Sequence, residues 1–144
     1  MPKINVRKMR KEDAGAVAKI DAAITKMPSR LDFDRILGEE VARDTDASFV
    51  AVINRKVVGF MISYITSGNF GADQCAWIPM FGVDPKYMGQ GIGIRLAEEI
   101  FQYYKDKGID KIYTSVRWDS TDILSFFKTL GFERSDFINL RKIL

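Results

Sequence analysis

The 144-residue sequence has no histidine and a single cysteine, Cys75. Histidine-based catalysis, zinc sites built on histidine and an internal disulfide are therefore excluded. Long apolar runs are missing as well, because glycines and polar residues interrupt the stretch 62–72, whereas a membrane span needs about 20 apolar residues. The basic N-terminal segment is not followed by the apolar stretch of a secretory leader. We expect a cytoplasmic protein that does not enter a membrane.

Strong charge of one sign is also missing. The formal net charge is +3, and lysines and arginines alternate with acids, as in "RKMRKED" at 7–13. A nucleic-acid partner is not expected, because binding to nucleic acid favours basic residues gathered on one face. Apolar residues, by contrast, make up 47% of the chain, which is enough to build one core. We predict a single domain over residues 1–144.

The hydrophobic patterns predict a mixture of strands and helices. Strands are expected over 4–9, 48–53, 57–65, 75–83, 111–117 and 137–144, and helices over 11–26, 34–43, 91–107 and 119–130. In the last helix, Ile123, Phe127 and Leu130 are predicted to face inward. The crossover from residue 75 to 117 predicts a mixed sheet. The predicted fold class is α/β in its α+β form, with a mostly antiparallel twisted sheet and helices on both faces.

Pro79 lies inside one of the predicted strands, 75–83. Proline has no N–H to donate to a sheet ladder, so this position predicts a sheet edge, a bulge or a place where neighbouring strands part. Parted strands leave backbone groups free to bind a ligand.

Three glycines at alternate positions, Gly89, Gly91 and Gly93, lead into the helix predicted over 91–107. Without side chains there, main-chain N–H groups can converge on one point, and the first turn of the helix adds free donors and the positive end of its dipole. A phosphate or pyrophosphate site is favoured over a simple turn. Neither G-x-x-x-x-G-K-[ST] nor G-x-G-x-x-G fits, since no Lys-Ser or Lys-Thr follows, and Ile94 and Leu96 replace the last glycine.

Two segments carry a resemblance to a known family. They are "FGVDP" ahead of "GQGIG" within 81–93 and "ILSFFKTLGF" at 123–132, and they resemble the GNAT superfamily of acetyl-CoA-dependent N-acetyltransferases. The order of predicted elements agrees over essentially the whole chain. The resemblance implies a GNAT-like sheet splayed at the cofactor site, acetyl-CoA (coenzyme A) as cosubstrate without a metal, and a small-molecule or protein amine as acceptor. It leaves a homodimer open.

The resemblance also implies which residues bind the coenzyme. In that family the glycine loop holds the pyrophosphate through main-chain N–H groups, and the strand before it pairs with the pantetheine arm. Carried onto this chain, the cofactor-binding residues are Phe81, Gly82, Val83, Met88, Gly89, Gln90, Gly91, Ile92, Gly93, Ile94, Ser120 and Phe127.

This sequence departs from the family where a tyrosine often acts as general acid, because that position is Phe127, and Ser120 replaces the usual asparagine. A phenyl ring has no proton to donate. Asp119 and Tyr113 are preferred as catalytic candidates over Asp73, Gln74, Ser120 and Tyr64, with helix capping and packing as the alternative roles of the preferred pair. An N-acetyltransferase acting on a primary amine, a coenzyme A-binding sensor or scaffold, and a general anion-binding module therefore all stay open.

Overall fold

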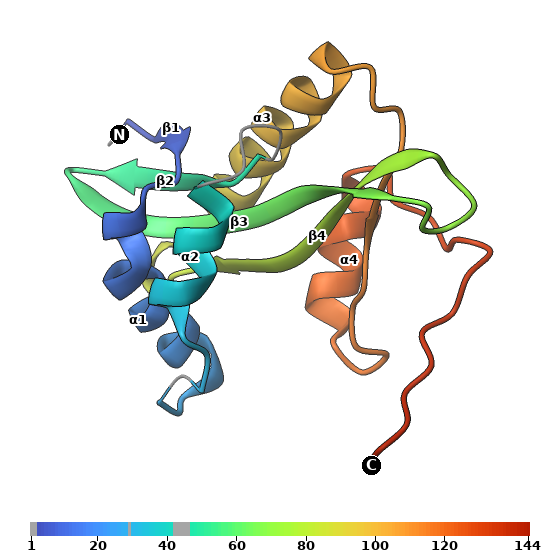
Figure 1. The fold of residues 1–144 in the computed structure, drawn as a ribbon. Helices are drawn as coiled ribbons and strands as arrows, with labels where there is room; N and C mark the ends of the chain where they lie inside the picture. The colour runs from blue at the N-terminus through green and yellow to red at the C-terminus, as the bar shows by residue number, and fades with distance from the viewer. Residues whose placement is uncertain (1–2, 29, 42–46) are drawn as a thin grey trace.

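Five strands form one sheet in the order β1-β2-β3-β4-β5 in the computed structural model, which describes residues 3–28, 30–41 and 47–144. The first four strands are antiparallel to their neighbours, and β5 runs parallel to β4. The elements, shown in Figure 1, are β1 (Asn5–Lys8), η1 (Lys11–Asp13), α1 (Ala14–Thr25), α2 (Phe33–Val41), β2 (Phe49–Ile53), β3 (Lys56–Ser67), β4 (Gln74–Val83), η2 (Pro85–Tyr87), α3 (Ile92–Asp106), β5 (Ile112–Thr114) and α4 (Thr121–Thr129). The predicted fold class is confirmed.

A tight turn joins β2 and β3 into a hairpin. Asn54 and Arg55 both have left-handed backbones, with φ of 49° and 67°. Two successive residues of this kind form the tight turn whose twist matches that of paired strands. The strands predicted over 48–53 and 57–65 thus pair with each other.

Helices cover both faces of the sheet and create two apolar cores (Figure 1). On one face, α1 and α2 pack against β2 and β3 through residues such as Val17, Leu37 and Phe60. On the other face, α3 buries an apolar stripe of Ile92, Leu96, Ile100 and Tyr104. The predicted second helix ended at Arg43, which lies outside the described residues, as does Ala42.

Helix α4 joins the same core as α3, but not through all of the predicted residues. Phe127 is buried, whereas Ile123 is 40% exposed. The prediction that Ile123 faces inward is wrong. Phe126 takes the inward position because it stacks on Phe81 of β4, which turns the preceding turn of the helix toward solvent.

The strand predicted over 137–144 is also wrong. Residues 133–144 contain neither helix nor strand, and Ile138 and Leu140 are 75% and 89% exposed. This segment passes the end of β5, where Asn139 Nδ2 donates to Ser115 Oγ at 2.6 Å. Because β5 has only three residues, it offers a further strand almost no ladder to extend.

A partly buried ion pair ties β1 to the start of α1. The guanidinium of Arg7 donates to both carboxylate oxygens of Asp13 at 2.8 and 2.9 Å, and the N–H of Arg10 donates to Asp13 Oδ2 at 2.7 Å. Burial raises the pKa of Asp13, which is 6% exposed, but the hydrogen bonds from Arg7 and Arg10 lower the pKa more, so the net shift is downward. Asp13 is therefore held as a carboxylate.

None of the helices within the described residues combines the length and the apolar character needed to cross a membrane.

Candidate functional site

Strands β4 and β5 separate halfway along β4. Their paired residues end at Ile78 and Thr114, where Thr114 Oγ1 donates to the Ile78 carbonyl at 2.8 Å. Pro79 follows directly, and β4 continues alone beside β3 as far as Val83. Both a bulge and a parting of strands, two of the outcomes predicted from Pro79, are thus confirmed.

The bulge changes which β4 residues face α3. Ala76 and Ile78 belong to the core on the α3 side, and the next members from β4 are Phe81 and Val83. The spacing of three between Ile78 and Phe81 matches the register shift in the β3–β4 pairing, because a bulge adds one residue to one strand.

The same alternation fixes the direction of the free backbone groups. Ala76 donates its N–H toward β5, at 3.0 Å, while Asp84 donates its N–H to the Val58 carbonyl of β3, at 2.8 Å. Residues with side chains on the same face point their N–H and C=O groups to the same side of a strand. Phe81 and Val83 share the face of Ala76, so their backbone groups point to the side that β5 has left.

The glycine loop ends at the start of α3. Gly89 and Gly91 have left-handed φ of 81° and 78°, and no heavy atom of the described residues lies within 4 Å of where a Cβ would stand. The N–H of Arg95 donates to the Gly91 carbonyl at 3.0 Å, the first hydrogen bond of the 15-residue helix. The N–H groups of residues 92–94 therefore have no acceptor within the helix and are available to an anion.

Gly93 is required for a different reason. A Cβ at this position would lie 2.9 Å from two ring atoms of Phe126 and 3.3 Å from Phe81. The third glycine thus lets α3 approach the aromatic side chains of β4 and α4. Sequence reasoning missed Phe126, whose only signal was its place in the pair "FF" of "LSFFK".

The remaining predicted coenzyme residues lie on β4, the glycine loop, the first turn of α3 and α4. Phe127 is 4% exposed and contacts Phe81, Phe126 and Phe132, with ring centroids 5.0 to 5.9 Å apart. Ser120 is the N-terminal cap residue of α4. On the loop and first turn of α3, Met88, Gln90 and Ile94 are exposed, while Gly82 and Ile92 are buried. Direct contact of each of these residues with a coenzyme stays a prediction.

The two catalytic candidates lie in different surroundings. Asp119 is exposed and accepts two hydrogen bonds, each 3.0 Å long, from Arg117. The hydrogen bond and charge of Arg117 lower the pKa of Asp119. Tyr113 is half-buried on β5, and its ring stacks on Phe70 with the centroids 4.2 Å apart. The cap of α4 is Ser120 rather than Asp119.

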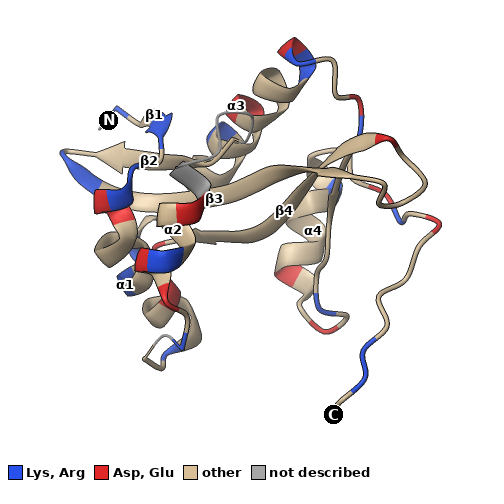
Figure 2. Cartoon of the chain, viewed as in Figure 1, with Lys and Arg blue, Asp and Glu red and all other residues tan. Residues whose placement is uncertain are grey.

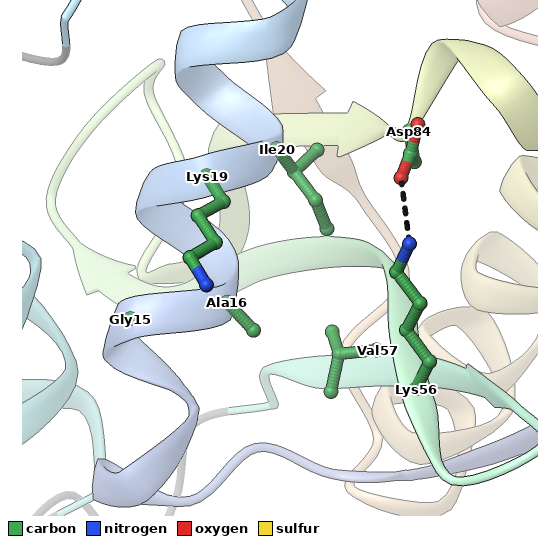
Figure 3. A pocket seen from close by; sticks show the side chains of 7 residues that line it. All are labelled: Gly15, Ala16, Lys19, Ile20, Lys56, Val57 and Asp84. Atoms are coloured by element: carbon green, nitrogen blue, oxygen red, sulfur yellow. Dashed lines mark ion pairs between the residues drawn. The ribbon is translucent and has the colours of Figure 1, made fainter.

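A separate cavity of about 360 Å³ lies between α1, the start of β3 and the end of β4 (Figure 3). On the side of the cavity opposite α1, the ammonium group of Lys56 lies 3.8 Å from Asp84 Oδ2 and 5.5 Å from the centroid of the Tyr87 ring (Figure 3). These contacts hold η2, which carries the chain from β4 to the glycine loop. None of the predicted coenzyme residues lines this cavity; its lining residues are Gly15, Ala16, Lys19, Ile20, Lys56, Val57 and Asp84.

Basic and acidic residues are interspersed along the helices in the cartoon coloured by charge (Figure 2). On α2, for example, Arg35 pairs with Glu39 at 3.2 Å, and the backbone N–H of Arg35 donates to Asp32 Oδ1.

The chain thus folds into a mixed sheet in which β4 and β5 part beside a helix capped by Gly91. Residues 16–132 match the family model described as the Acetyltransferase (GNAT) family. The chain belongs to this family.

Similar proteins agree with this assignment. An uncharacterized N-acetyltransferase of Methanocaldococcus jannaschii is 32% identical over 99 residues, which are 67% of this chain and 43% of that protein. A mycothiol acetyltransferase of Amycolatopsis mediterranei is 30% identical over 96 residues, 65% of this chain and 32% of that protein. The chain thus spans less than half the length of these curated relatives. The structure of aminoglycoside N-acetyltransferase AAC(6′)-Iy in complex with CoA has a TM-score of 0.84 at 17% identity, covering 99% of this chain and 96% of that one.

Proposed function

We propose that the chain is an N-acetyltransferase that transfers an acetyl group from acetyl-CoA to a primary amine of a small molecule or protein. The observation that carries this proposal is the separation of β4 from β5 next to the free N–H groups at the start of α3. The similarity to curated acetyltransferases and to the fold of an aminoglycoside N-acetyltransferase supports it.

The residues present fit coenzyme A. A pyrophosphate at the start of α3 would accept hydrogen bonds from the N–H groups of residues 92–94 and interact with the positive end of the helix dipole. The left-handed Gly89 and Gly91 keep the approach clear of side chains. Amide groups of a pantetheine arm would pair with the backbones of Phe81 and Val83, as an added strand pairs with a free sheet edge.

The chemistry asks three things of the protein. The acceptor amine must be neutral, and a lysine-type amine has a pKa of about 10.4, so a base has to remove its proton. The backbone N–H of Phe81 or Val83 can polarise the thioester carbonyl that bound acetyl-CoA supplies. The amine nitrogen then bonds to the carbonyl carbon, the carbon–sulfur bond breaks, and the thiolate takes up a proton.

Proton transfer is the open part of this proposal. The pKa of Asp119 is lowered, so its carboxylate is ionised near neutral pH. It can accept a proton there, although it is a weak base. Tyr113 carries a phenol that can donate a proton. We propose both as candidates for these roles.

A second candidate function is a coenzyme A-binding sensor or scaffold with weak turnover. Phe127 favours it, because this position is an apolar ring buried among other phenylalanines. Such a site would keep every backbone group that holds the coenzyme and lack the usual acid.

Two measurements separate these functions. Calorimetric titration with coenzyme A tests the site itself, and release of free thiol from acetyl-CoA with a panel of primary amines tests turnover. Binding together with amine-dependent thiol release supports the enzyme, and binding without release on any amine supports the sensor. No binding of coenzyme A would refute both.

A further inference from the structure

Three aromatic rings stack on the sheet face that points away from α3. Trp77 of β4 and Tyr113 of β5 are paired residues of neighbouring strands, so their side chains stand side by side. Phe70, from the loop between β3 and β4, lies over both. Its ring centroid is 4.2 Å from that of Tyr113 at an interplanar angle of 14°, and 5.7 Å from that of Trp77 at 23°.

The loop holds Phe70 in a backbone conformation that is rare for such a residue. Phe70 has a left-handed φ of 56°, between Gly68 at 75° and Gly71 at 71°. Because this backbone region is unfavourable for phenylalanine, contacts of the ring must hold Phe70 there. These contacts are the stacking and the edge-on ring of Phe137, whose centroid is 5.5 Å away. The two glycines give the loop backbone alternatives when Phe70 leaves the stack.

The pair of rings lies beside the place where transfer would occur. Trp77 and Tyr113 directly precede Ile78 and Thr114, the last paired residues before β4 and β5 part. Phe81, whose N–H points into the parted region, lies four residues beyond Trp77, which is at most roughly 13 Å at about 3.3 Å per residue. If an aromatic group of the acceptor took the place of Phe70, a short alkyl chain could thus carry the amine of the acceptor to the thioester.

We propose that the rings of Trp77 and Tyr113 form a subsite for an aromatic group of the acceptor, which Phe70 occupies when no acceptor is bound. This inference rests on the proposed acetyl transfer, and it narrows the acceptor to a small primary amine joined to an aromatic ring by a short alkyl chain. Phe70 itself shows that an aromatic ring can stack on Trp77 and Tyr113. Parallel offset rings and amines over aromatic faces are both favourable arrangements.

Binding can be measured without turnover. The chain has two tryptophans, Trp77 and Trp118, so Trp118→Phe leaves Trp77 as the sole tryptophan. In this background we expect 4-phenylbutylamine to change the emission of Trp77 saturably, and n-butylamine and n-decylamine to do so at least tenfold more weakly. Equal responses to phenylalkyl and alkyl amines would overturn the proposal.

Variants of Phe70 and Trp77 test whether Phe70 competes with the acceptor for the subsite. Phe70→Leu, which keeps an apolar side chain but removes the ring, is expected to tighten 4-phenylbutylamine binding three- to tenfold, and Phe70→Gly to do the same while relieving the left-handed φ. Trp77→Leu is expected to weaken binding at least tenfold by calorimetry. Thermal melting confirms that each variant is folded. Unchanged affinity in a folded Phe70→Gly and in a folded Trp77→Leu contradicts the proposal.

The acetylation assay keeps this proposal separate from the proposed function. With ω-phenylalkylamines of one to six methylenes, we expect the lowest KM at an intermediate length, and higher KM for alkylamines of equal carbon number. Acetylation of all amines with the same KM would leave the enzyme in place and refute the aromatic subsite. Acetylation of other primary amines but of none of these would keep the enzyme and refute the aromatic acceptor. No thiol release with any primary amine would refute the enzyme, while the emission of Trp77 would still decide for or against the subsite.

Discussion

Phe81 of β4 and Phe126 of α4 lie face to face, with ring centroids 4.9 Å apart and ring planes 1° from parallel. Gly93 of α3 meets the edge of this pair. One strand and two helices are therefore fitted together at a single place, which lies next to the parted strands and the glycine loop.

Gly93→Ala should destabilise the fold. The added methyl group would stand 2.9 Å from Phe126, and such overpacking lowers the free energy of unfolding by about 1–3 kcal/mol. Urea denaturation measures the change. Gly38→Ala is the control, since Gly38 lies in α2 with no described heavy atom within 4 Å of an added Cβ, and there we expect a gain of roughly 0.4–1 kcal/mol. Equal stability of Gly93→Ala and the unchanged protein would mean that Phe81 and Phe126 shift to accommodate the methyl group at little cost.

Gly91→Glu should weaken coenzyme A binding at least about tenfold, or roughly 1.4 kcal/mol. The carboxylate would stand where the pyrophosphate is proposed to bind. Gly108→Glu is a matched control, because Gly108 has a φ of 77° and equally open surroundings at the other end of α3. Calorimetric titration of both variants separates the backbone cost, which they share, from the effect at the site. The same loss of affinity in both would argue against the loop as the binding site.

Phe127→Tyr should raise kcat by up to about 10²-fold, the low end of general acid catalysis, without changing the affinity for coenzyme A. The new phenol would supply a proton at the position where the family often has one. Phe132→Tyr serves as the control, since its ring is a neighbour of Phe127, with centroids 5.0 Å apart. An unchanged kcat in folded Phe127→Tyr would show that another group already protonates the leaving thiolate.

If Asp119 is the base, its pH behaviour follows from its partner. Arg117 lowers the pKa of Asp119, so the carboxylate stays ionised and kcat/KM should not fall through Asp119 protonation between pH 8 and about 5. Asp119→Asn should lower kcat at every pH. Arg117→Ala should return the pKa of Asp119 toward its ordinary value of about 3.9 and move the acidic limb of the rate to higher pH. An active Asp119→Asn variant with normal kcat would remove Asp119 from the mechanism.

Asp13→Asn should destabilise the protein in a pH-dependent way. The folded-state pKa of Asp13 is lowered, so the ion pair with Arg7 stabilises the fold above the ordinary pKa of about 3.9, and this stabilisation is lost as the pH falls through the lower folded-state value. We expect a loss of about 1–3 kcal/mol at pH 7 that shrinks toward pH 2, measured by urea denaturation at both pH values. A constant difference between the two proteins would indicate that ionisation of Asp13 does not matter.

The sequence predicted those features that depend on local chemistry. The strands on either side of the β2–β3 turn, the helix α3 and the disturbance at Pro79 each follow from a few neighbouring residues. The glycine loop was recognised for the same reason, although the packing role of Gly93 was not, because it depends on a ring from another helix.

The parts that could not be predicted depend on distant segments. The apolar residues at 137–144 suit a strand, yet a strand needs a partner, and β5 has three residues. Ile123 has the right spacing for a buried position, but the contact of Phe126 with Phe81 decides the rotation of α4. The stack of Phe70 on Trp77 and Tyr113 joins a loop to two strands, and no spacing in the sequence indicates it.

The bulge at Pro79 has an evolutionary consequence. If residues 78–81 paired regularly at their present length, strict alternation would turn Phe81 and Val83 over to the side of α1, together with their backbone groups. Deleting one residue of the bulge would instead leave Phe81 two positions after Ile78 and so keep it on the side of α3. Homologous chains that share the site should therefore either keep a bulge in this segment or have one residue fewer here.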